Sequence, residues 1–350
     1  MSEPAAPLDP AGLRVVTAGG SADDAVTRLD RHGLGDGLPV VPPTRPRVTA
    51  MLAGRAPDEP VTELVPLPYA TTVEDVALCA VLAGCEPGAL PYLVAAVHAV
   101  AAPEFNLLGI STTTGNAAVG VVVHGDGPPR YGFDTGANCL GPSRVNAGFG
   151  RALALACRLL GGAVPGVLDM ATLGQPAKLA LCLAEGEVPS GWTSWHRSRG
   201  CASGSEAVTV FGAAGLLEVA DTWSDSARGL LESLASATPL PAAVSASGEL
   251  VGGGQQLYVL PPEWVVRLVA EGWTRESVGA FLYEHAVLAV DRLPAGAASR
   301  LTDRARERGV LRCAASPDDF LLVCTGGTGV KAAYLPSWPG GSRAVTRPVV

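Results

Sequence analysis

Apolar positions follow two periods along most of the 350 residues, and each period predicts its own kind of element. Apolar residues three and four positions apart predict helices over 21–33, 48–52, 71–84, 91–101, 146–160, 225–235, 263–271 and 274–286. Short apolar runs predict strands over 107–114, 117–124, 179–184, 207–212, 242–247, 255–260 and 319–324. Helices that alternate with buried strands are typical of an α/β protein.

The order of these elements repeats once along the chain. Helix, strand, glycine turn, buried strand and helix follow one another in 91–160, and a similar order resumes at residue 207. We therefore expect an α/β fold of two topologically similar lobes, each a small mixed sheet flanked by helices. The expected divisions are an N-terminal arm with a proline-rich extended segment in 1–60, lobe 1 in 61–206 and lobe 2 in 207–350.

A loop rich in small residues and amides, 134–146, runs directly into the predicted helix 146–160. Glycines and a proline interrupt regular structure in this loop. The unpaired N–H groups and the positive dipole end of a helix N-terminus favour an anion. The sequence therefore predicts a substrate-binding loop for a negatively charged group, formed by Gly136, Asn138, Gly141, Ser143, Arg144 and Asn146. An ordinary glycine-rich turn is the structural alternative.

Cys139 lies inside this loop, where the same helix field predicts a thiol shifted toward its thiolate. It is therefore a candidate nucleophile, and a buried, inert cysteine is the alternative. The chain has eight cysteines without C-x-x-C spacing, and most of them lie in apolar runs where cysteine behaves as a small hydrophobic residue. Because no export signal is evident, we expect these cysteines to be reduced.

Charged side chains that accompany the predicted strands are candidates for proton transfer. His124 and Glu185 each end a predicted strand, at the edge where open α/β sheets place their ligands. Lys178 and Asp169 lie in the polar, irregular segment before the strand that Glu185 ends. A lysine beside carboxylates acts as an acid or a base when burial shifts a pKa. A structural histidine and a surface ion pair are the alternatives.

A second glycine-rich loop follows the predicted strand 319–324. We expect it to line the same pocket and to add Gly326, Gly327 and Lys331 to the substrate-binding residues, with a tight turn as the alternative. Near the start of the chain, the proline-rich segment 35–44 should be extended, and its Asp36 either reaches a pocket or ends a turn.

Two tryptophans and a histidine in 192–196 predict a loop that either covers a ligand or packs between lobes.

The charge and the apolar runs of the chain exclude two classes of partner. A formal net charge of −8, with no stripe of lysine and arginine, excludes nucleic acid. The longest apolar run, 89–102, is too short to span a membrane. The first residues lack the basic and apolar regions of a signal peptide, so we expect a cytoplasmic protein.

No cofactor is predicted from the motifs. The glycine and lysine spacing of a P-loop and the glycine fingerprint of a dinucleotide site are both absent from the sequence. The cysteines and histidines show no metal-ligand spacing, so we assign no metal site, and a metal requirement stays open.

Four segments together resemble a broad, poorly characterised bacterial family: Asp36-Gly-Leu-Pro-Val-Val-Pro-Pro-Thr, Asn138-Cys-Leu-Gly-Pro-Ser-Arg-Val-Asn, Asp169-Met-Ala-Thr-Leu-Gly-Gln-Pro-Ala-Lys and Cys324-Thr-Gly-Gly-Thr-Gly. That family is associated with short selenocysteine or cysteine proteins known by their UGSC motif. The resemblance covers nearly the whole chain and implies thiol or selenol chemistry nearby, without an assigned activity. The family has Gly-Asn after the proline of the second segment, where this chain has Ser143-Arg144.

Polar and glycine clusters that follow buried strands favour an enzyme of small-molecule metabolism or biosynthesis. We expect it to act on a small anionic metabolite by lyase, hydro-lyase or isomerase-type chemistry without a nucleotide cofactor. One alternative is a thiol enzyme that uses Cys139 as its nucleophile. Another is a non-catalytic partner subunit of a thiol or selenol redox system. A homodimer is the default expectation for its assembly.

Overall fold

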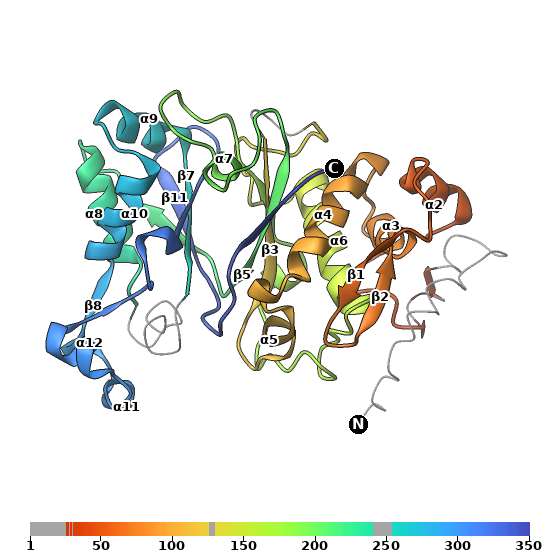
Figure 1. The fold of residues 1–350 in the computed structure, drawn as a ribbon, viewed down its shortest axis with the longest axis horizontal. Helices are drawn as coiled ribbons and strands as arrows, with labels where there is room; N and C mark the ends of the chain where they lie inside the picture. The colour runs from red at the N-terminus through yellow and green to blue at the C-terminus, as the bar shows by residue number, and fades with distance from the viewer. Residues whose placement is uncertain (1–25, 28, 30, 126–129, 241–253) are drawn as a thin grey trace.

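The computed structural model describes residues 26–27, 29, 31–125, 130–240 and 254–350, and it shows a mixed α/β protein (Figure 1). Within this described part, the strands form two four-stranded sheets and two two-stranded sheets. The first four-stranded sheet has the order β12 (Val345–Pro348), β5 (Ala207–Ala213), β3 (Ala118–His124) and β4 (Cys182–Ala184). The second has the order β6 (Leu217–Ala220), β11 (Lys331–Pro336), β7 (Gln256–Leu260) and β10 (Phe320–Cys324).

Both four-stranded sheets are mixed. In the first, β12, β5 and β3 are antiparallel neighbours, and β3 and β4 are parallel. In the second, β6, β11 and β7 are antiparallel neighbours, and β7 and β10 are parallel. The chain leaves the first sheet after β5 and returns to it after β11, so the two sheets are tied together by two crossings.

The two sheets pack face to face through apolar side chains. Val122 and Phe211 of the first sheet share one buried cluster with Leu257 and Leu321 of the second. The neighbouring position on β3, Val121, points the opposite way and belongs to the cluster formed with the helices. Each sheet is therefore covered on both faces, which explains why its strands are apolar at successive positions.

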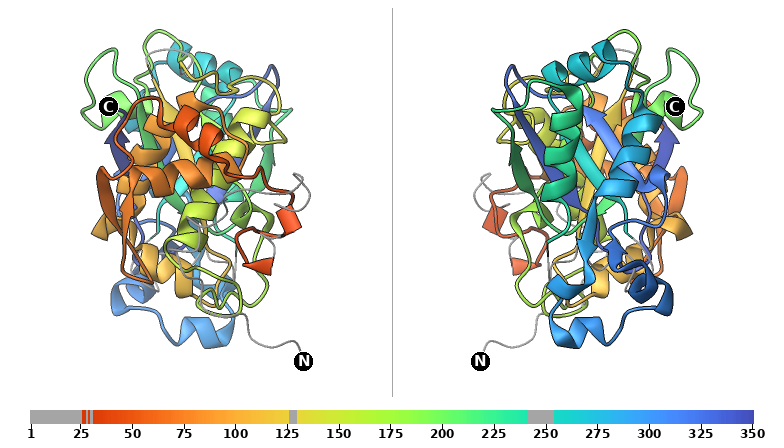
Figure 2. Two further views of the ribbon diagram at one scale, coloured as in Figure 1. Left: turned by 90° about the vertical axis from the view of Figure 1, so that its right-hand side faces the viewer. Right: turned by 90° about the vertical axis from the view of Figure 1, so that its left-hand side faces the viewer.

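Helices cover the outer face of each sheet. The first outer layer contains α3 (Val73–Leu82), α4 (Leu90–Val100) and α6 (Arg144–Leu159). The second contains α8 (Ala227–Ala237), α9 (Pro262–Ala270) and α10 (Arg275–His285). The left and right views of Figure 2 look onto these two outer layers in turn. The order of layers is thus helices, sheet, sheet and helices.

Smaller elements complete the described fold. They are β1 (Pro60–Leu64), β2 (Tyr69–Thr72), β8 (Val287–Ala289), β9 (Val310–Arg312), α2 (Arg45–Leu52), α5 (Leu107–Thr112), α7 (Trp195–Ser198), α11 (Ala295–Ala298) and α12 (Asp303–Arg308).

Side-chain caps fix the starts of the long helices near the predicted positions. The Thr72 hydroxyl accepts from the Asp75 amide at the start of α3, and the Asp75 carboxylate accepts from the Thr72 amide. Ser143 caps α6, and Thr274 caps α10 in the same reciprocal way as Thr72. Each cap satisfies N–H groups that a helix cannot pair internally. The predictions of these three helices are confirmed.

One predicted strand is wrong: the first part of 107–114 is the helix α5, Leu107–Thr112. Asn106, with a φ of 55°, accepts a hydrogen bond from the Gly109 amide and so caps a helical turn. A short apolar run does not distinguish a buried helix from a strand, and this local cap decides between them. The predicted strand 242–247 lies outside the described residues.

The sheets do not divide where the predicted lobes do. β5 begins at Ala207, the first residue of predicted lobe 2, and pairs with β3 along its whole length. β12, near the C-terminus, pairs with β5 in the same sheet. Pairing between distant segments, which no local pattern encodes, therefore places two strands of the second half in the sheet of the first half.

Among the described residues, no single helix has the length and apolar character needed to cross a membrane. One bent pair, Pro87–Val100 with Pro103–Thr112, meets that test when its two helices are taken together.

Gly120 tests the packing of the first sheet's side of the cluster between the sheets, to which Phe211 and Leu181 belong. A Cβ atom there would lie 2.6 Å from the Phe211 ring and 2.9 Å from a Leu181 methyl group. We expect Gly120→Ala to lower the free energy of unfolding by about 1–3 kcal/mol, because overpacking forces neighbours out of position. Gly215→Ala is the control, since a Cβ there meets nothing within 4 Å. Urea denaturation that gives equal stabilities for the two variants would contradict the tight packing around Gly120 in this cluster.

Candidate functional site

A cavity of about 180 Å³ lies among the last turns of α6, the start of β3, α5 and the segment 163–179. Most of its lining is apolar, with walls that include Ile110, Val119 and Leu155. Its charged and hydroxyl side chains are Asp36, Ser111, Arg158, Asp169 and Lys178. An apolar cavity with a few convergent polar groups is the usual form of a small-molecule site.

Asp169 and Lys178 form an ion pair at this cavity. The Lys178 Nζ lies 2.6 Å from the Asp169 Oδ2, and the side chains are 22% and 11% exposed. Asp169 is held by a turn in which its Oδ1 accepts from the Ala171 amide, and Lys178 ends a short 3-10 turn, Pro176–Lys178. The two charges are therefore fixed, partly shielded from water and next to an open space.

Asp36 reaches the same cavity from the proline-rich segment. Arg151 on α6 donates two hydrogen bonds to the Asp36 carboxylate, at 2.7 and 2.8 Å, and two more to the carbonyl oxygens of Leu38 and Pro39. Burial tends to raise the pKa of Asp36, but the bonds from Arg151 and the Leu38 amide outweigh burial and lower the pKa. Asp36 is thus ionised and forms an ion pair with Arg151.

Arg158 lies seven residues after Arg151, two turns along the same face of α6. Its Nε is buried and has no hydrogen-bond partner among the described residues. Burial lowers the pKa of Arg158, and the charges of Asp36 and Asp169 oppose that shift. Both carboxylates are already bound by other cations, so the guanidinium faces the cavity without a paired anion.

The predicted loop before α6 is held by its own side chains. The Asn146 amide group donates to the carbonyl oxygens of Asp134 and Cys139, at 2.9 and 3.2 Å, and accepts from the Asp134 amide. The Ser143 hydroxyl accepts from the Asn146 amide as the helix cap and donates to the Asp134 carboxylate. Asn146 and Ser143 therefore stabilise the loop, and neither lines the cavity beside α6 or the cleft between the glycine-rich loops.

This loop meets the second glycine-rich loop. The Gly326 amide and the Thr325 hydroxyl both donate to the Thr135 carbonyl, at 3.0 and 2.9 Å. A separate cleft of about 300 Å³ lies between the two loops. It brings together the predicted residues Asn138, Cys139, Gly141, Gly326, Gly327 and Lys331.

The predicted single pocket is divided in the structure. Lys178 and Asp169 line the cavity beside α6, not the cleft between the loops. Arg144, predicted to hold an oxyanion, is 78% exposed and pairs with Glu86 at 3.1 Å on the surface. Gly136 belongs to the lining of neither space. Spacing in the sequence identified polar loops correctly but not which of them converge.

The prediction of a thiolate at Cys139 is wrong. The side chain is buried, and burial raises the pKa of the thiol, although the hydrogen bond with Thr325 opposes the shift. The cost of removing a charge from water therefore exceeds the benefit of the helix field.

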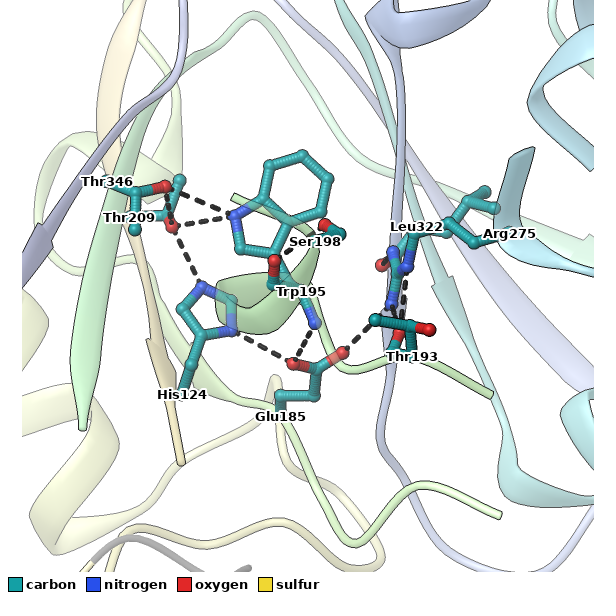
Figure 3. A network of polar contacts seen from close by, with 9 residues as sticks. All are labelled: His124, Glu185, Thr193, Trp195, Ser198, Thr209, Arg275, Leu322 and Thr346. Carbon is teal, nitrogen blue, oxygen red and sulfur yellow. Dashed lines mark hydrogen bonds and ion pairs between the residues drawn. The ribbon is translucent and has the colours of Figure 1, made fainter. Parts of the chain in front are cut away.

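His124 and Glu185 lie in a buried network between the layers (Figure 3). The Glu185 Oε2 accepts from the Trp195 amide at 2.8 Å and lies 3.1 Å from the His124 Nδ1. The other oxygen, Oε1, lies 3.4 Å from the Arg275 guanidinium. The His124 Nε2 bonds to the Thr209 hydroxyl at 2.9 Å. The network thus joins the first sheet to α10 of the second outer layer.

The network holds its charge on Glu185 and Arg275. Burial opposes ionisation of Glu185, but the hydrogen bond from His124, the charge of Arg275 and the Trp195 amide lower its pKa. Burial lowers the pKa of His124, which favours the neutral ring. Both side chains are 0% exposed, they line neither the cavity nor the cleft, and their bonds join the layers. Their predicted role in proton transfer stays a prediction.

The predicted loop 192–196 is also part of this interior. Trp195 begins the helix α7, and its indole donates to Thr209 at 2.8 Å. Trp192 and Trp195 are both buried, each in an apolar cluster of a different layer. Trp192 also lines a separate cleft, so the two predicted roles stay open.

Sequence reasoning missed the arginines Arg151, Arg158 and Arg275. The first two carried a signal: two arginines seven residues apart on a helix of small apolar residues mark a polar line on one face. Arg275 carried no such signal, because its partners lie far away in the sequence.

No family model matches the chain, and no curated protein matches it. Within the described residues, no group of three or more histidine, cysteine, aspartate or glutamate side chains could hold a metal ion.

Glu185→Gln tests the buried network. Removing this charge leaves Arg275 buried without a counterion, which should lower the free energy of unfolding by about 3–5 kcal/mol. Glu232→Gln is the matched control, because its pair with Arg228 is exposed on α8 and should contribute under about 1 kcal/mol. Chemical denaturation that shows the same small loss for both variants would rule out the network as a link between layers.

Proposed function

We propose that the protein is an enzyme that removes a proton from carbon next to a carbonyl group of a small anionic metabolite. Such a step begins many lyase, hydro-lyase and isomerase reactions. The supporting observation is the Lys178–Asp169 pair, 2.6 Å apart and partly buried, which lines a cavity with apolar walls. The reaction centre is this cavity, and the metabolite is its ligand.

The pair supplies the two charges that the step needs. The Asp169 carboxylate takes the proton from carbon, and the electron pair of the broken C–H bond moves onto the carbonyl oxygen. The Lys178 ammonium donates a hydrogen bond to that oxygen and stabilises the enolate. Apolar walls strengthen both interactions because they exclude water. The proton later returns to carbon, or a leaving group departs.

The charges around the cavity favour an anionic substrate. Three cationic side chains, Arg151, Arg158 and Lys178, stand against two carboxylates, Asp36 and Asp169. One positive charge is therefore in excess. The sequence predicted an anion site at the loop before α6. This proposal instead places the anion beside the last turn of the same helix.

The thiol enzyme has weaker support. The raised pKa of Cys139 and its burial both oppose a resting thiolate. A cytoplasmic location belongs to the proposal, and its support is that all eight cysteines are free.

We also infer that the part of the chain up to β6 and the part from β7 onward are two copies of one unit, so that in this proposal the halves divide after β6 and not at residue 207. The order β4, β3, β5 and β12 has the same parallel and antiparallel pairings as β10, β7, β11 and β6. In each half, a parallel pair is joined through helices and is followed by an antiparallel strand. The edge strands β6 and β12 are exchanged between the halves.

Deuterium exchange tests the reaction. In D₂O, we expect the wild-type protein to exchange the C3 protons of a small 2-oxo acid, and Lys178→Met to slow this exchange about 100-fold. Lys331→Met is the matched control, because Lys331 lines the other cleft, and it should exchange at the wild-type rate. NMR measures the exchange, and thermal unfolding checks that both variants fold.

Two results would contradict the proposal. One is equal exchange by Lys178→Met and the wild type. The other is a panel of small 2-oxo acids, aldehydes and ketones in which none exchanges above the rate without protein.

A further inference from the structure

We infer that the ligand of the cavity beside α6 is a small monocarboxylate with a short apolar side chain, and that Arg158 binds its carboxylate. The carbonyl group of this ligand rests on the proposed function. The carboxylate and the apolar chain rest on separate observations of the cavity.

The first observation is the state of the Arg158 guanidinium. Its Nε is buried, yet no described residue accepts a hydrogen bond from it. A buried donor without a partner is costly, and more so when it is charged. A carboxylate fits a guanidinium through two parallel hydrogen bonds, so it satisfies this donor better than a neutral group does.

The second observation is that the protein supplies no carboxylate of its own to Arg158. Asp36 accepts two bonds from Arg151, and Asp169 is bound by Lys178. Both acids are close enough to act on the charge of Arg158, but both are committed elsewhere. One guanidinium is left for one carboxylate. A second carboxylate on the ligand would meet Asp36, Asp169 or an apolar wall.

The third observation is the size and lining of the space. The volume is about 180 Å³, and a cavity of about 150 Å³ accommodates benzene. A ligand of roughly six to nine non-hydrogen atoms therefore fits. Ile110, Val119, Leu155 and Leu179 line the rest of the space and favour carbon over polar groups. Each buried methylene group should raise the affinity about 4-fold.

Titration calorimetry with 3-methyl-2-oxobutanoate tests this inference. We expect it to bind at least 10-fold more tightly than its neutral amide and than the dicarboxylate oxaloacetate. Arg158→Gln should weaken binding of the acid at least 10-fold and leave binding of the amide unchanged. Arg158→Lys keeps the charge but loses the paired donors, so its affinity for the acid should lie between those of the wild type and Arg158→Gln.

Arg144→Gln is the matched control. Arg144 lies at the start of the same helix but is exposed and paired with Glu86, so the variant should bind like the wild type. Equal binding of the acid and the amide would overturn the inference, as would an Arg158→Gln protein that folds and binds the acid normally.

The proposed reaction and the inferred ligand can be contradicted independently of each other. If the acid binds through Arg158 but its C3 proton does not exchange in D₂O, the inference stands and the proposed reaction is wrong. If exchange depends on Lys178 but not on Arg158, and the amide exchanges as fast as the acid, the reaction stands and the inference is wrong.

Discussion

The face-to-face packing of the two four-stranded sheets is the constraint on which the rest of the structure depends. Gly120 leaves the space that the Phe211 ring fills, and apolar side chains of both sheets meet around it. With one face of each sheet against the other sheet, the long helices lie on the outer faces. The candidate cavity is accordingly in an outer layer, where α6 ends over the start of β3.

Two ion pairs show how burial separates structural from chemical roles. The Glu185 carboxylate has a partner at each oxygen and no exposed surface, so its charge is fully paired within the network that joins the layers. The Asp169 carboxylate also has a partner at each oxygen, Lys178 and the Ala171 amide, but it lines an open cavity. Both pairs look alike in a list of charged residues. Only the second leaves room for a reacting molecule.

Local features of the fold were predictable from the sequence, and long-range features were not. Thr72, Ser143 and Thr274 mark helix starts by their own side chains, so the sequence indicated these helices correctly. The place of β5 in the first sheet depends on its pairing with β3, which no local pattern reveals. The helix after Asn106 was mistaken for a strand because a short apolar run fits either element.

The candidate site was predictable in part for the same reason. Asp169 and Lys178 lie nine residues apart, and the sequence indicated that they act together. Their meeting with Asp36 and Arg158 depends on the packing of α6, which spacing does not encode. The prediction of a thiolate at Cys139 was wrong because the sequence indicates the helix that would stabilise the charge but does not indicate that the sulfur is buried.

A crystal structure of the protein with 3-methyl-2-oxobutanoate would locate the ligand directly. The predicted result is a molecule in the cavity beside α6, with its carboxylate on the Arg158 guanidinium and its carbonyl oxygen toward Lys178. A ligand bound instead in the cleft between the two glycine-rich loops, beside Lys331, would contradict the assignment of the reaction to the Lys178–Asp169 pair.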